Sequence, residues 1–123
     1  MKPFAFEHAG ARLLACEGEL AAPGDALEFV SASYEHDAHG IVLEAAQLPA
    51  AFVDLRTGFA GEFIQKLQNY QLRTALVLAD AGAGDPGHGE RFREFLLEAR
   101  TGKVFRVFDV RSHALDWLAH SPP

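Results

Sequence analysis

The chain has 123 residues, of which 49% are apolar, and its formal net charge is −6 at neutral pH. This length predicts one domain, spanning residues 1–123, with a hydrophobic core of its own. The acidic balance, without any block rich in lysine and arginine, argues against nucleic-acid binding, which needs a basic face to displace counterions from phosphates.

The sequence carries no sign of export or membrane insertion. No apolar run approaches the ~18 residues of a membrane helix, and the opening MKPFAFEHAG lacks the apolar stretch of a signal peptide. Cys16 is the one cysteine, which excludes an intramolecular disulfide and a cysteine-based zinc site, and its apolar neighbours favour a buried, inert thiol. We therefore expect a cytoplasmic protein with no membrane contact.

The first third of the chain predicts a hairpin followed by a helix. Residues 4–8 and 11–16 are strand-like runs separated by a two-residue turn, as in an antiparallel hairpin. Asp25 and Glu28 have the spacing of a capping box, so a helix is expected to begin there and to end in the polar cluster 36–40. The hairpin would form one edge of a sheet.

The middle of the chain predicts two buried strands with a long helix between them. Residues 41–43 are an apolar run, and 48–53 are expected to lead onward through one helical turn. Apolar side chains recur with helical spacing over 57–70. Residues 74–79 have no polar side chain after the first, which is typical of a central parallel strand covered on both faces.

The last third continues the alternation. The glycine-rich segment 81–89 is interpreted as a surface loop, because no lysine follows its glycines as a phosphate-binding P-loop requires. Residues 91–100 predict a helix and 104–108 a strand, and Asp109 is expected to cap a final helix. Because strands alternate with helices, we predict an α/β fold: a mostly parallel sheet with an amino-terminal antiparallel hairpin and helices packed on the sheet.

Two blocks in the carboxyl-terminal two-thirds carry a family resemblance. The first reads D-L-R-T-G-F-A-G-E over residues 54–62. It continues with Gln65-Lys66 and Asn69-Tyr70, and the second block contains Phe92-Arg93, Phe95, Glu98 and Gly102. These residues resemble an uncharacterised bacterial family catalogued as domain of unknown function 4180, in which Ser-Asn-Arg-Gly usually stands where this chain has Ala99-Arg100-Thr101-Gly102. Membership implies no established activity.

The order of the predicted elements also resembles the STAS domain, the fold of anti-anti-sigma factors and of sulfate-transporter tails. Those regulators carry an Asp-Ser-Ser-Gly motif at the start of a helix after an inner strand, and the serine before the glycine is phosphorylated. The comparable place here holds Asp54-Leu55-Arg56-Thr57-Gly58, with one residue more between the aspartate and the hydroxyl. The resemblance implies a STAS-like fold and makes Thr57 the counterpart of the phosphorylated serine.

The helix start at Thr57 is the first candidate site. In one interpretation Thr57 caps the helix, its Oγ accepting a hydrogen bond from a backbone N–H. In the other, Thr57 is phosphorylated or binds an anion at the positive end of the helix dipole, where Arg56 could pair with a phosphate. Asp54 and Gly58 complete this candidate contact surface.

The carboxyl edge of the parallel sheet is the second candidate site, because ligands of open α/β sheets bind beyond the carboxyl ends of the strands. Residues 54–58 are expected to meet Glu44, Asp80, Asp109 and Arg111 there. Such a cluster could hold a metal-bound phosphate group or a basic side chain of a partner. It could equally consist of helix caps and solvated strand ends.

These observations favour binding over catalysis. The expected function is that of an intracellular regulatory or protein-interaction module, with an unidentified protein partner that docks at the helix start. The alternative is a binder or enzyme for a phosphorylated small molecule that uses Asp54, Arg56, Asp80 and Asp109. No cofactor or metal is expected, because the compact histidine cluster at 36–39 offers no predictable third ligand. A homodimer and membership of a toxin–antitoxin type of assembly stay open.

Overall fold

The computed structural model describes residues 1–78 and 89–120, so Asp80 and most of the glycine-rich loop lie outside the described residues. The strands are β1 (Lys2–His8), β2 (Ala11–Glu17), β3 (Gly40–Glu44), β4 (Arg73–Val77) and β5 (Phe105–Phe108). The helices are α1 (Asp25–His36), α2 (Ala50–Val53), α3 (Phe59–Asn69), α4 (Gly89–Ala99) and α5 (Arg111–Ala119), with the 3₁₀ turns η1 (Ala45–Gln47) and η2 (Leu55–Thr57).

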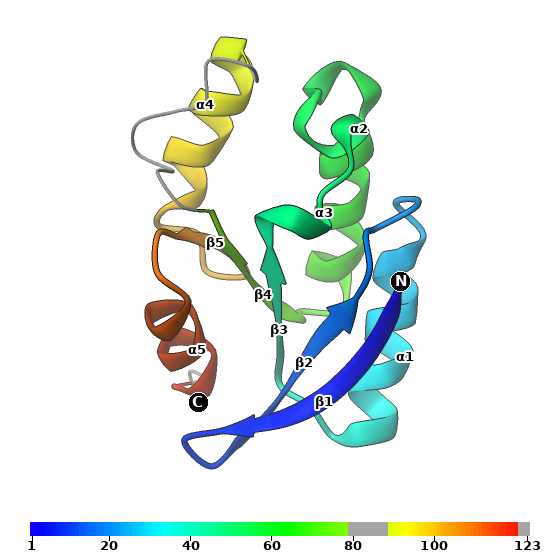
Figure 1. Ribbon diagram of the computed structural model, residues 1–123, viewed down its shortest axis with the longest axis vertical. Helices are drawn as coiled ribbons and strands as arrows, with labels where there is room; N and C mark the ends of the chain where they lie inside the picture. Colours follow the sequence, from blue (N-terminus) through cyan, green and yellow to red (C-terminus); the bar gives the residue numbers. More distant parts are fainter. Residues whose placement is uncertain (79–88, 121–123) are drawn as a thin grey trace.

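The strands form one five-stranded sheet whose spatial order, β1-β2-β3-β4-β5, is the order of the chain. β1 runs antiparallel to β2, and the other neighbouring strands run parallel to each other. The predicted α/β fold is therefore confirmed: a mostly parallel sheet with an amino-terminal hairpin and helices packed on it (Figure 1). Each crossover connection joins strands that are neighbours in the sheet.

The helices cover the two faces of the sheet unequally. In β3, the side chains of Ile41 and Leu43 belong to a large apolar cluster with the long helices α1, α3 and α4 and with Phe52 of the short helix α2. We call this side of the sheet the three-helix face, after its long helices. Val42, between them, points to the opposite face, where it packs with Ala114 and Leu118 of α5. We call this the single-helix face. Figure 1 shows α5 across the sheet from α1 and α3.

Aromatic rings fill the centre of the three-helix face. Phe29 of α1, Phe52 of α2 and Phe63 of α3 are all fully buried. The ring of Phe63 meets the rings of Phe29 and Phe52 edge-on, at centroid distances of 6.4 and 6.0 Å. Such pairs contribute about 0.5–1.5 kcal/mol each beyond the burial of their apolar area. These rings belong to the larger of the two apolar clusters that the sheet separates.

The start of α1 differs from the prediction. The helix begins after Gly24, whose position carries no side-chain cap, so the capping box expected from Asp25 and Glu28 is wrong. The carboxylate of Asp25 turns back instead and accepts hydrogen bonds from the backbone N–H groups of Ala21, at 2.7 Å, and Ala22. The Asp25 side chain thus stabilises the turn that leads into the helix.

The starts of α3 and α5 also differ from the predictions. α3 begins at Phe59 rather than at Thr57, because Gly58 has a left-handed conformation, with φ of 76°, and separates the helix from η2. α5 follows Val110, where no side chain caps the helix, so the cap expected from Asp109 is wrong. Among residues 1–78 and 89–120, no helix combines the length and the apolar character that crossing a bilayer requires.

Candidate functional site

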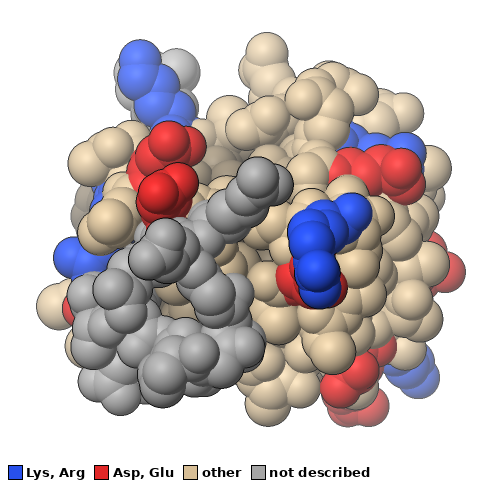
Figure 2. Space-filling model, turned by 90° about the horizontal axis from the view of Figure 1, so that it is seen from above, with Lys and Arg blue, Asp and Glu red and all other residues tan. Residues whose placement is uncertain are grey.

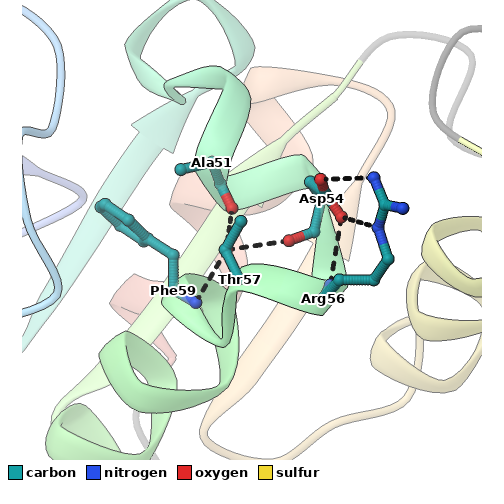
Figure 3. A network of polar contacts seen from close by, with 5 residues as sticks. All are labelled: Ala51, Asp54, Arg56, Thr57 and Phe59. Carbon is teal, nitrogen blue, oxygen red and sulfur yellow. Dashed lines mark hydrogen bonds and ion pairs between the residues drawn. The ribbon is translucent and has the colours of Figure 1, made fainter.

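The hydroxyl of Thr57 fastens the turn formed by residues 54–58. Its oxygen lies 2.6 Å from the carbonyl oxygen of Ala51 and 2.9 Å from that of Asp54, so its single proton is shared between two acceptors (Figure 3). The same oxygen accepts a hydrogen bond from the backbone N–H of Phe59, at 3.1 Å. The side chain of Thr57 therefore connects α2, η2 and the first residue of α3.

Asp54 and Arg56 form a forked ion pair on the outside of the same turn. Oδ1 of Asp54 accepts hydrogen bonds from Nε of Arg56, at 3.0 Å, and from its backbone N–H, while Oδ2 accepts from Nη2, at 3.1 Å. The side-chain hydrogen bond from Arg56 lowers the pKa of Asp54, and the pKa of Arg56 is raised in return. The pair is open to solvent, because the side chains of Arg56 and Asp54 are 83% and 39% exposed. The pair orders the turn more than it stabilises the fold.

The side chain that caps the amino terminus of α3 comes from the residue before the N-cap position. Gly58 occupies the N-cap position and has no side chain, while Thr57, one residue earlier, accepts the N–H of Phe59. Asp54, Arg56, Thr57 and Gly58 are thus brought together in one turn, as the sequence predicts, although Thr57 precedes the helix instead of starting it. The turn is exposed over Arg56, Thr57 and Gly58.

The remaining charges of the carboxyl edge form separate pairs. Nη1 of Arg111 lies 2.6 Å from Oε1 of Glu44, which joins α5 to the end of β3. Oδ1 of Asp109 lies 3.5 Å from Nη2 of Arg100, a partner that the sequence analysis missed because no local pattern connects the two residues. In Figure 2, which views this end of the molecule, acidic and basic side chains lie in small mixed groups rather than in a field of one sign. Asp80 is not among the described residues.

Neither a metal site nor a reactive thiol emerges from the described residues. Within the part of the chain that the structure describes, no three His, Cys, Asp or Glu side chains gather as a metal ion would require. Cys16 is buried, as predicted, and burial raises the pKa of its thiol, which keeps it protonated. The side-chain amide of Gln47 donates to the backbone carbonyl of Cys16 and lies 3.1 Å from its sulfur.

The architecture defines an α/β domain with a mostly parallel sheet and an exposed, charged, hydrogen-bonded turn at the carboxyl end of its strands. The family model described as "Domain of unknown function (DUF4180)" matches residues 9–118, and the chain belongs to this family. No curated protein and no solved structure matches the chain.

Proposed function

We propose that the domain is a non-catalytic regulatory module that binds a protein partner through residues 54–58. The observation that carries this proposal is that the turn is exposed and yet already formed. Thr57 and the paired side chains of Asp54 and Arg56 hold its backbone by hydrogen bonds that need no partner. A surface ordered in advance loses little conformational entropy when it binds, which favours a docking role.

A STAS-like relationship supports a regulatory role for the same turn. The hairpin followed by alternating helices and strands resembles the element order of STAS domains. On this proposal Thr57 corresponds to their phosphorylated serine, although one residue more separates it from the aspartate. On this proposal the domain acts in the bacterial cytoplasm, and phosphorylation of Thr57 controls its partner.

Phosphorylation would change the turn by simple chemistry. A phosphate on Thr57 has no proton to donate, so the bonds to the carbonyl oxygens of Ala51 and Asp54 would be lost. The added negative charge would also attract the guanidinium of Arg56 away from Asp54, because phosphate accepts a bidentate pair as well as a carboxylate does. The modification would therefore reshape the whole contact surface.

The alternative function, a site for a phosphorylated ligand built from Asp54, Arg56, Asp80 and Asp109, receives less support. Arg56 is already held by Asp54, and Asp109 already lies beside Arg100, so a ligand phosphate would have to displace a carboxylate of the protein. No described contact joins the two pairs into one cluster.

The test is to isolate the protein, with its Thr57→Glu and Thr101→Glu variants, from host cells and to compare bound proteins and phosphorylation by mass spectrometry. Thr101 is the matched control, because it is exposed and also precedes a glycine. We expect Thr57→Glu to change the recovery of a specific partner and Thr101→Glu to leave it unchanged. Equal recovery of all bound proteins by the parent and both variants would overturn the proposal.

A further inference from the structure

A polar groove of about 280 Å³ lies at the end of α3 opposite the 54–58 turn. It is formed where α1 and α3 both end. Its polar and aromatic lining consists of Ser33, Tyr34, Asp37, His39, Tyr70 and Gln71. The groove is independent of the contact surface proposed above, because the length of α3 separates the two.

The two helices end in the same way beside the groove. Asp37 and Gln71 follow α1 and α3 in the left-handed conformation, each with φ of 53°. In both turns a backbone N–H reaches back five residues, from Ala38 to the carbonyl of Ser33 and from Leu72 to that of Leu67. Glycine is the usual residue at such a position. Here both positions carry polar side chains instead, and both side chains line the groove.

The groove presents negative charge and aromatic surface together. The carboxyl ends of two helix dipoles meet there, and the carboxylate of Asp37 adds a full charge. Tyr34 is 75% exposed and Tyr70 is 52% exposed, which is unusual for large aromatic side chains. Aromatic faces beside a carboxylate attract organic cations.

The protein already binds one of its own cations in this manner. At the carboxyl end of α5, the guanidinium of Arg73 lies 4.0 Å from the ring centroid of Trp117. It donates hydrogen bonds to the backbone carbonyls of Trp117, at 2.9 Å, and Leu118. Arg56 shows a second way of binding a guanidinium group: its Nε and Nη2 atoms donate two hydrogen bonds to the carboxylate of Asp54. The groove between α1 and α3 has both features: the carboxyl ends of helices beside aromatic rings, as around Arg73, and a carboxylate, as beside Arg56.

We propose that this groove binds a guanidinium group, carried by a small guanidino compound or by an arginine side chain of a partner. Asp37 accepts the two parallel N–H groups, and the rings of Tyr34 and Tyr70 stack on the planar cation. Oγ of Ser33 donates to the carbonyl of Val30, at 2.7 Å, and keeps lone pairs for a further N–H. Nη1 of Arg12 donates to the carbonyl of His36, at 3.1 Å, and Arg12 is not among the lining residues of the groove.

The test is an NMR titration of the full chain, labelled with ¹⁵N, at constant ionic strength. Methylguanidinium and an acetylated, amidated arginine are the two probes, and tetramethylammonium is the cation without N–H groups. We expect saturable shifts of the amides at 37–39 and 70–72, with tighter binding of the guanidinium probes. Saturation by methylguanidinium indicates a free guanidino ligand, whereas saturation by the arginine derivative alone indicates a partner side chain. Equal shifts with all three cations would overturn the proposal.

Substitutions of the lining residues test whether the guanidinium group binds in this groove. Asp37→Asn keeps a residue that tolerates the left-handed conformation, and we expect it to weaken guanidinium binding about tenfold. Replacing Tyr34 or Tyr70 by leucine should weaken binding about threefold. Glu62→Gln, which removes an exposed carboxylate in the first turn of α3, is the matched control and should leave the affinity unchanged. Affinity that is unaffected by Asp37→Asn would contradict the site.

Discussion

The two faces of the sheet are stabilised in different ways. On the three-helix face, apolar side chains from several helices interlock around Phe29, Phe52 and Phe63. On the single-helix face, α5 is the one helix among residues 1–78 and 89–120 that packs on the strands, and its apolar contacts are bordered by charged ones. The difference indicates that the three-helix face supplies most of the hydrophobic stabilisation, while the charged contacts on the single-helix face determine the position of α5.

Directional contacts hold α5 at three places. Asp116 accepts a hydrogen bond from His8 of β1, at 2.8 Å, and Arg111 pairs with Glu44 at the end of β3. Arg73 of β4 donates to the carbonyl of Trp117, whose ring also packs on Phe108, at a centroid distance of 5.5 Å. Because these partners stand on different strands, they fix both the direction and the position of the helix.

The largest expected effect comes from emptying the three-helix face. Phe63→Ala removes a fully buried ring, and we expect the free energy of unfolding to fall by about 3–5 kcal/mol. Phe4→Ala is the control, since Phe4 is 41% exposed and should change stability by less than about 1 kcal/mol. Urea unfolding followed by circular dichroism measures both. Similar losses for the two variants would mean that the three-helix face is not the stabilising one.

A pair of glycine substitutions tests how closely α5 fits its face. A Cβ at Gly40 would lie 2.8 Å from Cδ2 of Leu118 and 3.2 Å from the carbonyl oxygen of Arg73, so Gly40→Ala should cost about 1–3 kcal/mol. A Cβ at Gly61, inside α3, would meet open space, and Gly61→Ala should stabilise the protein by up to about 1 kcal/mol. Changes of the same sign in thermal unfolding would refute this difference.

The smallest effect concerns pH and the link between α5 and β1. The hydrogen bond from His8 lowers the pKa of Asp116 below its usual 3.8. Since the folded-state pKa is the lower one, the stability from this carboxylate is complete above pH 3.8 and disappears as the pH falls through the folded value. Asp116→Asn should therefore be less stable than the parent near neutral pH, and the gap should close in acid. Urea unfolding midpoints of the parent and of Asp116→Asn, compared across the pH range, measure this difference in stability.

His8→Ala provides the control for the pH dependence. In that background the carboxylate has lost its partner, so Asp116→Asn should have little further effect at any pH. A gap between parent and Asp116→Asn that persists in acid while the chain stays folded would show that the carboxylate acts through packing rather than through its charge.

The sequence predicts the strands well where the signal, a run of apolar residues, lies within one segment of the chain. The apolar runs at 41–43 and 74–79 identify β3 and β4, and their lack of polar side chains correctly indicates a sheet covered on both faces. Because all the side chains in such a run are apolar, as Ile41 and Val42 are, the sequence does not predict which of them points to which face of the sheet. The unequal covering of the two faces therefore appears only in the structure.

The candidate site shows the same limit. Asp54, Arg56, Thr57 and Gly58 are neighbours in the chain, so their grouping is predictable from the sequence. One of the two acceptors of the Thr57 proton, the carbonyl of Ala51, is placed by the way in which α2 and η2 fold together, and no sequence pattern encodes that. Partners distant in the chain are harder still: Glu44 and Arg111, which are 67 positions apart, meet because β3 and α5 pack together.

The agreement between strand order and chain order has a consequence for synthesis on the ribosome. Each strand pairs with the strand made just before it, so the sheet can extend stepwise as the chain emerges. α5 contacts all five strands, and its link from Asp116 to His8 closes a loop of 108 positions. A nascent chain stalled before α5 would present Leu13 and Val42 uncovered, as a surface that chaperones recognise.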